Sequence, residues 1–327
     1  MPPQETPYSN ETPQEVLSGM SHLAGPATLL LLAIAAFVFV YAYMGSVTVT
    51  PSAETASAAV ATDAFAGVSL RAKSAVVVDL RTGQTLYRHN SGTQLPLASL
   101  TKVALVLAVR DVLPQETVVT IPYDTAPKGA AMRLGKGENW KLGDVINFTL
   151  VASSNEGANI LAQVTDSAIR ARYPQAPAGG AALWRMNSLA KSLGLARTYF
   201  LNVNGLDSSA SQAGAYGSAE DVATLFAYAA STSPESFSGT TRDGLLLTDE
   251  AGNTTSAFNT NEALGAIPGL IMGKTGYTDL AGGNLAVVFD IGLAHPVVAV
   301  VLGSSHGGRF IDMQQLVTAA RIAVAQQ

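Results

Sequence analysis

Leu97-Ala98-Ser99-Leu100-Thr101-Lys102 leads directly into an apolar run, residues 103–109, that is long enough for the core of a buried helix. Residues three apart on a helix share one face, so the Ser99 hydroxyl and the Lys102 amine are expected within one turn of each other. A serine alcohol becomes a good nucleophile when a base removes its proton. A lysine amine can act as that base only if burial or neighbouring cations lower its pKa. The stretch therefore predicts a nucleophile beside its base.

A second stretch of the chain, Ser188-Leu189-Ala190-Lys191, has the same Ser-x-x-Lys spacing. It lies in an amphipathic segment, residues 181–193, whose apolar positions recur at helical spacing. Polar side chains on such a helix are usually solvated. Spacing alone does not distinguish the two candidates, so the rest of the sequence has to do so.

Composition excludes several kinds of site. The 327 residues include no cysteine, which rules out disulfides and thiolate metal ligands. The histidines are scattered and lack metal-ligand spacing, so we expect no metal and no cofactor. No basic patch or arginine-rich helix indicates a nucleic-acid partner. The length allows one large domain or two small ones. The histidines are His22, His89, His295 and His306.

The N-terminal part has three sections of different composition. Residues 1–24 are rich in Pro, Glu, Ser and Thr, and predict a disordered acidic tail. Residues 25–46 predict a transmembrane anchor, because 27–44 are free of charge and approach the ~20 residues that cross a bilayer. Residues 47–70 predict a flexible linker. A catalytic domain is expected over residues 71–327.

The alternatives to an anchor are a cleaved signal peptide and a buried core helix. The region before the apolar segment is acidic rather than basic, and the segment exceeds the usual ~7–15 residues of a signal-peptide core. The flanking stretches offer nothing to bury a core helix. Both observations favour an uncleaved anchor. Charge gives no orientation, because the first basic residue is Arg71.

Strand patterns at both ends of the remaining chain enclose a series of helical patterns. This arrangement predicts an α/β domain whose sheet joins the beginning and the end of the chain. Strands are expected at 74–80, 85–89, 117–121, 270–276, 283–289 and 297–303, a Gly-rich loop at 128–139, and helices at 142–152, from 155, at 181–193, 218–230 and 310–325.

Three short motifs stand in a fixed order along the chain: Ser99-x-x-Lys102, Ser153-x-Asn155 and Lys274-Thr275-Gly276. Together they are the signature set of the penicillin-recognising serine enzymes, penicillin-binding proteins and serine β-lactamases. No Ser-x-Asn separates Ser188 from Lys274, so the second Ser-x-x-Lys does not fit the set.

The chain also resembles the low-molecular-mass penicillin-binding proteins that are serine-type D-alanyl-D-alanine carboxypeptidases, over residues 73–325. The resemblance is carried by ASLTK at 98–102, FLNVNGLD at 200–207, YGSAEDVA at 216–223, KTGYTD at 274–279 and AGGNL at 281–285. It implies a β-lactamase/transpeptidase-like α/β fold, with a mainly antiparallel sheet flanked by helices and a helical subdomain.

The resemblance implies a catalytic role for five residues. Ser99 would be the acylated nucleophile and Lys102 its general base. Ser153 would relay a proton toward the leaving amine, and Asn155 would hold Lys102 and the substrate amide. Lys274 would supply positive potential that keeps Lys102 neutral.

The resemblance also implies substrate binding at Thr275, Gly276, Tyr277 and Arg309. Thr275 and Arg309 would contact the terminal carboxylate of the substrate. The backbone N–H groups of Ser99 and Tyr277 would form the oxyanion hole.

The expected function is a membrane-anchored carboxypeptidase that trims peptidoglycan stem peptides and is covalently inhibited by β-lactams. Its catalytic domain would lie on the extracytoplasmic side of the cell membrane. The alternatives are D,D-endopeptidase or transpeptidase action, a serine β-lactamase, and a β-lactam or muropeptide sensor. Ser154 departs from the glycine often found in relatives, and the C-terminal β domain that many relatives carry is not expected here.

Overall fold

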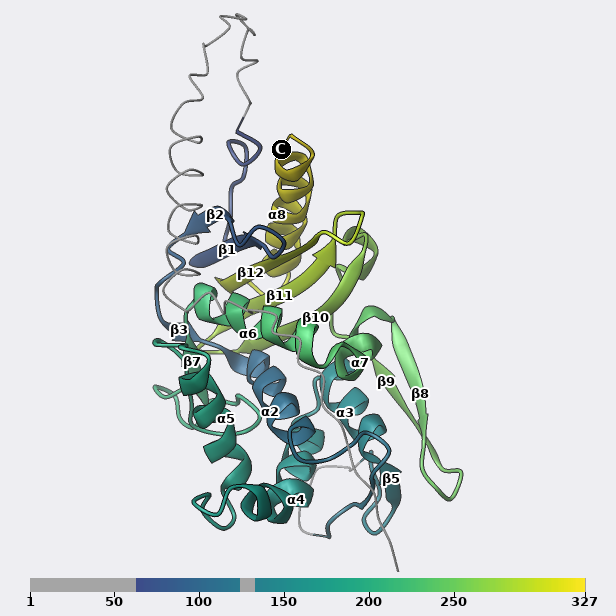
Figure 1. Cartoon of the computed structure of the whole chain (residues 1–327). Coiled ribbons are helices and arrows are strands. Elements are labelled where there is room, and N and C mark those ends of the chain that lie inside the picture. The colour runs from purple at the N-terminus through teal and green to yellow at the C-terminus, as the bar shows by residue number, and fades with distance from the viewer. Residues whose placement is uncertain (1–62, 124–132, 327) are drawn as a thin grey trace, which may run out of the picture. The chain divides into compact units, whose positions relative to one another are not determined.

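The computed structural model describes residues 63–123 and 133–326. Figure 1 shows a sheet at one end and a group of helices at the other. The strands are β1 (Ser74–Asp79), β2 (Thr85–His89), β3 (Leu95–Pro96), β4 (Val118–Thr120), β5 (Asn139–Lys141), β6 (Tyr199–Phe200), β7 (Ala215–Gly217), β8 (Gly244–Thr248), β9 (Thr254–Phe258), β10 (Leu270–Thr278), β11 (Gly282–Asp290) and β12 (Pro296–Ser304). The helices are α2 (Thr101–Arg110), α3 (Leu142–Val151), α4 (Asn155–Arg172), α5 (Ala181–Ser192), α6 (Ala219–Thr232), α7 (Pro234–Phe237) and α8 (Gly308–Ala325), with short 3-10 turns η1 (Ala98–Leu100), η2 (Ser238–Thr241) and η3 (Leu264–Ala266).

The main sheet joins the two ends of the domain, as the strand patterns predict. Its five antiparallel strands follow the order β10-β11-β12-β1-β2. The first strand pairs with the last, so that Val76 lies opposite Val300. Strand β10, which carries Lys274, forms one edge of the sheet (Figure 1).

Both faces of this sheet are buried, which explains why its strands are apolar runs without polar alternation. Successive side chains of a strand point to opposite faces. Val76 and Val300 therefore join the core shared with the helical region, whereas Val77 and Val301 join a second core under α8. Helix α8 packs on β11 and β12, and α6 packs on the other face.

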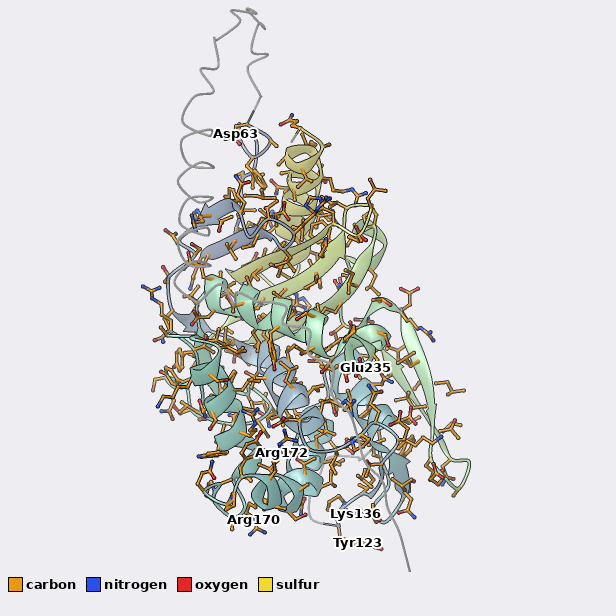
Figure 2. All side chains as sticks on the ribbon, in the orientation of Figure 1. Asp63, Tyr123, Lys136, Arg170, Arg172 and Glu235 are labelled. Carbon is orange, nitrogen blue, oxygen red and sulfur yellow. The ribbon has the colours of Figure 1, made fainter. Side chains whose placement is uncertain are left out.

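Helix α2 is the centre of the helical region. Every residue from Thr101 to Val109 is buried, and α3, α4, α5 and α6 all pack against it. A helix that is apolar on all sides has to be enclosed in this way. Helix α4 ends at the surface, where Arg170 and Arg172 occupy its last turn and complement its dipole (Figure 2).

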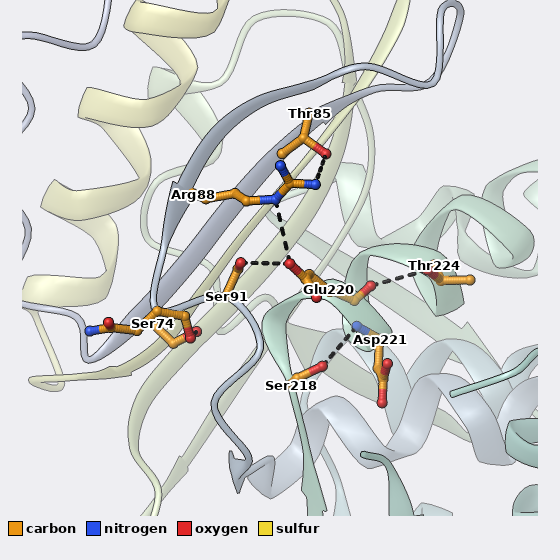
Figure 3. Close-up of polar contacts among 9 residues, drawn as sticks. Ser74, Thr85, Arg88, Ser91, Ser218, Glu220, Asp221 and Thr224 are labelled. Carbon is orange, nitrogen blue, oxygen red and sulfur yellow. Dashed lines mark hydrogen bonds and ion pairs between the residues drawn. The ribbon is translucent and has the colours of Figure 1, made fainter. Parts of the chain in front are cut away.

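Helix α6 is fastened to the far edge of the sheet by polar contacts. The Ser218 hydroxyl caps its N-terminus by accepting a hydrogen bond from the Asp221 N–H at 3.1 Å. The Glu220 carboxylate accepts a hydrogen bond from the Ser91 hydroxyl at 2.7 Å and lies 3.5 Å from Arg88 on β2 (Figure 3). These contacts fix α6, which covers the core between the sheet and α2.

The folded domain begins earlier than the sequence predicts. Residues 63–70, assigned to the flexible linker, pack on the α8 side of the sheet because they include large apolar side chains. Phe65 stacks on Tyr87 with ring centroids 5.1 Å apart, and Val68 and Leu70 contact the same core.

A buried carboxylate fastens this entering segment. Asp312 of α8 accepts hydrogen bonds from the backbone N–H groups of Arg71 and Ala72, both at 3.0 Å. The Ser304 hydroxyl at the end of β12 donates a third hydrogen bond to Asp312, at 2.6 Å. The side chain is fully buried, and these donors satisfy it.

The predicted tail and anchor, with the apolar span 27–44, lie outside the described residues. Within residues 63–123 and 133–326, no helix has the length and apolar character needed to span a bilayer.

The β8–β9 hairpin is an element that the sequence analysis does not anticipate. It projects beside α3 (Figure 1). Side chains along the hairpin alternate between a buried and an exposed face. Leu247 and Ala257 lie on the buried face, and Leu246 and Phe258 lie on the exposed face. The Gly-rich loop expected at 128–139 ends one residue earlier than predicted, because Asn139 begins β5, which pairs with β4.

Candidate active site

Ser99 lies in a tight turn immediately before α2. The turn is the 3-10 segment η1, and α2 itself begins at Thr101. Ala98 has a φ of +49°, a left-handed conformation that is uncommon outside glycine. The Thr101 hydroxyl donates to the Ala98 carbonyl at 2.7 Å and holds the turn in place. Such strained positions gather at functional sites.

Lys102 is fully buried and contacts three oxygen atoms. Its Nζ lies 2.7 Å from the Ser99 hydroxyl, 2.8 Å from Asn155 Oδ1 and 2.8 Å from the Asn204 carbonyl. Burial lowers the pKa of Lys102 to about 7, because removal from water disfavours the charged amine. The predicted nucleophile and base are therefore in direct contact, and at neutral pH a substantial fraction of the molecules has a neutral Lys102.

The contacts of Lys102 determine where its lone pair points. A neutral amine has two N–H groups and one lone pair. The oxygens of Asn155 and Asn204 are carbonyls, which accept hydrogen bonds and have no proton to donate. When both N–H groups are donated to these two carbonyls, the lone pair faces the third neighbour, the Ser99 hydroxyl. This is the arrangement that a general base requires.

Ser153 joins α3 to α4 and also adopts a left-handed conformation, with a φ of +54°. This turn presents the Ser153 hydroxyl to Lys274 Nζ at 2.9 Å. Its neighbour Ser154 caps α4, because the Ser154 hydroxyl accepts a hydrogen bond from the Gly157 N–H at 3.0 Å. The departure from glycine at position 154 is thus explained by a structural role.

Lys274 and Thr275 lie on the edge strand β10 and are almost completely buried. Lys274 Nζ donates to Ser153 and, at 2.8 Å, to the Thr275 carbonyl. Burial lowers its pKa well below the ordinary value, and the nearby positive charges of Lys102 and Arg309 lower it further. The Thr275 hydroxyl contacts the Thr260 hydroxyl at 2.5 Å, so Thr260 is an additional residue at this end of the site.

Gly276 allows the edge strand to approach the nucleophile. A Cβ atom at this position would lie 2.9 Å from the Leu97 carbonyl and 3.2 Å from the Ser99 nitrogen. Tyr277 follows with about half of its side chain exposed, and its ring meets His306 edge-on at 4.9 Å. The two predicted oxyanion donors therefore come from chain segments that touch each other.

Arg309, in the first turn of α8, contacts the backbone of strand β10, and its predicted contact with the substrate carboxylate stays a prediction. Only 4% of it is exposed, and its Nη1 donates to the Gly276 carbonyl at 2.8 Å. Its Nε has no hydrogen-bond partner among the described residues. The guanidinium thus binds the backbone of strand β10 and adds positive potential at Lys274.

The site therefore contains three buried cationic side chains, those of Lys102, Lys274 and Arg309. In the described part of the chain, none of them forms an ion pair with a carboxylate. Buried charges are normally paired, so this excess of positive charge favours an anionic ligand and a neutral Lys102.

The sequence analysis misses two residues at the site. Asn204 acts through its backbone carbonyl, which leaves no side-chain signal, although it lies in the FLNVNGLD segment. Thr260 lies outside all the motifs. The competing pair is elsewhere: Ser188 and Lys191 lie on the outer part of α5, and Lys191 is exposed.

A serine hydroxyl beside a buried lysine, with a second serine–lysine pair next to it, defines an acyl-transfer enzyme of the penicillin-recognising class. The comparison with protein families agrees with this class. Residues 55–306 match the model of the D-alanyl-D-alanine carboxypeptidase family Peptidase_S11, and the chain belongs to this family.

Three known proteins illustrate the relationship. The chain is similar to D-alanyl-D-alanine carboxypeptidase DacF of Bacillus subtilis, with 30% identity over 72% of this chain and 58% of that protein. It is similar to DacB2 of Mycobacterium tuberculosis, with 28% identity over 71% of this chain and 75% of that protein. The crystal structure of penicillin-binding protein D2 of Listeria monocytogenes with cefotaxime bound has a TM-score of 0.64 and 26% identity, and the match covers 77% of this chain and 98% of that one. The chain thus spans little more than half the length of DacF.

Proposed function

We propose that this protein is a serine D-alanyl-D-alanine carboxypeptidase that removes the terminal D-alanine from peptidoglycan stem peptides. The single observation that carries the proposal is the contact of Lys102 Nζ with Ser99 at 2.7 Å, inside a buried, positively charged site. Such a site supplies both an activated nucleophile and a place for the terminal carboxylate of the substrate.

Acylation would begin when the substrate carboxylate binds at the Thr275 end of the site, attracted by Lys274 and Arg309. Ser99 Oγ attacks the penultimate carbonyl while Lys102 takes the hydroxyl proton. The negative charge that develops on the carbonyl oxygen is stabilised by the N–H groups of Ser99 and Tyr277.

The leaving group would receive its proton through Ser153. In this scheme the hydroxyl of Ser153 donates its proton to the departing amine and takes up the proton that Lys102 removed from Ser99, so that D-alanine leaves protonated and Lys102 is neutral again. The Lys274 contact at 2.9 Å orients the Ser153 hydroxyl. Water then attacks the acyl-enzyme with Lys102 as base and releases the shortened peptide and free Ser99.

β-Lactams would acylate Ser99 by the same attack, as the Listeria relative solved with cefotaxime suggests. Rapid release of the penicilloyl group is not expected, because no carboxylate contacts Lys102 within the described residues. Besides Ser99, Lys102 contacts only the amide oxygens of Asn155 and Asn204 among the described residues, and neither can act as a second base beside Lys102 to speed the attack of water. Rapid nitrocefin turnover would instead identify a β-lactamase.

The decisive experiment is incubation of the purified protein with a pentapeptide muropeptide, followed by mass spectrometry. Loss of one alanine is expected. Cleavage of cross-linked dimers would identify an endopeptidase, and new cross-links a transpeptidase. Stable acylation by penicillin with no peptide product would indicate a sensor.

We further propose that residues 27–44 anchor the protein in the cell membrane, with the catalytic domain on the extracytoplasmic side. The support is the charge-free apolar segment and the location of the proposed substrate outside the membrane. In a protease-protection assay on intact cells stripped of their wall, the domain should be digested. Protection of residues 71–327 would refute this topology.

A further inference from the structure

The segment Asn202–Asp207, here called the brace, contacts three parts of the active site and contains no residue of the Ser-x-x-Lys, Ser-x-Asn and Lys-Thr-Gly motifs. The first contact is with the base: the Asn204 carbonyl accepts a hydrogen bond from Lys102 Nζ at 2.8 Å. Without this acceptor, the neutral amine would have an N–H group free to be donated to Ser99. The lone pair would then face away from the proton that it has to accept.

The second contact is with the turn that carries the nucleophile. Gly205 has a φ of +83°, and a Cβ atom built on it would lie 1.9 Å from the Ala98 carbonyl and 2.8 Å from the Thr101 hydroxyl. Only glycine fits both the left-handed conformation and this close approach. The brace therefore packs directly against the strained residue that precedes Ser99.

The third contact is with the edge strand. Asp207 accepts hydrogen bonds from the Thr278 hydroxyl at 2.9 Å and from the Leu280 N–H at 3.2 Å. Thr278 follows Tyr277, whose N–H is the expected oxyanion donor. One short segment thus touches the supports of the base, the nucleophile and the oxyanion hole.

Hydrogen bonds, rather than close packing, hold the brace on its outer side. Val203 packs against the core, but on the outer side residues 201–203 and Asn159 border a cavity of about 720 Å³. Asn204 Nδ2 donates to Asn159 Oδ1 on α4 at 3.2 Å. Within the brace, Asn202 Oδ1 accepts from the Gly205 N–H at 2.7 Å, and Asn204 Oδ1 accepts from the Leu206 N–H at 2.9 Å.

From these contacts we propose that Asn204 and its partner Asn159 are positioning residues, which fix the Asn204 carbonyl so that the lone pair of Lys102 faces Ser99. The inference rests on the proposed function and adds two residues to the machinery of the same reaction. Neither residue touches the substrate in this scheme. Both act on Lys102, by orienting its amine and by keeping water away from it.

The test measures the rate of acylation by a fluorescent penicillin as a function of pH in the full-length protein. Asn159→Ala and Asn204→Ala are each expected to lower the second-order rate at pH 7 by about 10- to 100-fold, the size of effect that a misplaced catalytic group produces. Water admitted around Lys102 should raise its pKa, so the acid limb of the pH profile should move to higher pH. In the double variant the two losses should not add, because both break one contact.

Asn187→Ala is the matched control. Asn187 Nδ2 donates to the Phe200 carbonyl at 2.9 Å, and Asn187 Oδ1 accepts from the Phe200 N–H at 2.9 Å. Asn187 therefore fixes the chain two residues before the brace and does not contact Lys102. This variant should lose stability but keep the wild-type pH profile. A wild-type profile in Asn159→Ala and Asn204→Ala, or an equal shift in Asn187→Ala, would overturn the proposal. If the wild-type protein is not acylated at all, the proposed function fails instead.

Discussion

Two Ser-x-x-Lys sequences of this chain, at Ser99 and at Ser188, have the same spacing and opposite surroundings. Lys102 is fully buried at the start of the central helix α2, whereas Lys191 is exposed near the end of α5. Burial lowers the pKa of Lys102 to about 7. An exposed lysine on a surface helix remains hydrated, and hydration is what keeps an amine protonated.

The partners of the two pairs differ as much as their burial. Lys102 contacts the oxygens of Ser99, Asn155 and Asn204. No side-chain hydrogen bond or ion pair is found for Ser188 or Lys191 in the described part of the chain. Reactivity in this molecule therefore comes from the surroundings that other segments build around a motif, and the following substitutions test this conclusion in pairs.

The largest difference is expected for the serines. Ser99→Ala removes the only atom of this scheme that becomes acylated, so labelling by fluorescent penicillin and release of D-alanine should both vanish. Ser188→Ala should leave both at the wild-type level. Gel fluorescence and an assay of free D-alanine measure the two activities. Persisting D-alanine release in Ser99→Ala would show that another nucleophile acts.

The lysines should give the next largest difference. Lys102→Met keeps the volume of the buried side chain but removes the general base, which typically costs about 10²- to 10⁴-fold in rate. Lys191→Met should acylate at the wild-type rate. Stopped-flow measurement of penicillin acylation distinguishes the outcomes, and equal rates for the two variants would contradict the assignment of Lys102.

Two glycines extend the comparison to the backbone. Gly276→Ala would push strand β10 away from the Ser99 nitrogen, and a loss of about 10- to 100-fold in acylation is expected from such a displacement. Gly194 follows α5 with a φ of +71° and open space around it. Gly194→Ala should cost about 1–2 kcal/mol of stability for the left-handed conformation and leave activity unchanged. Urea unfolding and acylation rates, measured on both variants, give the result.

The last difference concerns stability as a function of pH and does not involve the reaction. The pKa of Lys102 is about 7 in the folded state and near 10.5 when the chain is unfolded. Between these values the unfolded state binds more protons, so the free energy of unfolding should rise with pH. Lys274 acts in the same direction. Lys102→Met should reduce the rise between pH 7 and pH 10, and Lys191→Met should retain it. An unchanged slope in Lys102→Met would mean that Lys102 is hydrated.

Much of the architecture follows from patterns along the chain. The apolar run after Lys102 predicts the buried helix α2, and the strand patterns at both ends of the domain predict a sheet that joins them, as observed. The three motifs predict that Ser99, Ser153 and Lys274 meet in one site, and the structure brings them together. The helix and the sheet depend on composition and periodicity, which are local properties of a sequence, whereas the meeting of the motifs is implied by the resemblance to the penicillin-recognising serine enzymes.

The remaining features depend on contacts between distant segments. Ala98 and Ser153 adopt left-handed conformations that their residue types do not announce. Asn204 contributes a backbone carbonyl, which every residue has. Arg309 donates to the Gly276 carbonyl from the first turn of α8, a contact between segments about 30 residues apart in the chain. In each case tertiary packing overrides what the local sequence favours.

The buried carboxylate of Asp312 has a mechanical consequence. A pull on the backbone at Arg71 acts on the paired hydrogen bonds at Arg71 and Ala72 before it reaches β1. The load then passes into α8, which lies against the face of the sheet opposite to the helical region. Asp312 therefore links the entering segment to the start of α8, one turn after Arg309, so the contact that fixes the entry of the chain also helps to position the helix that supports strand β10.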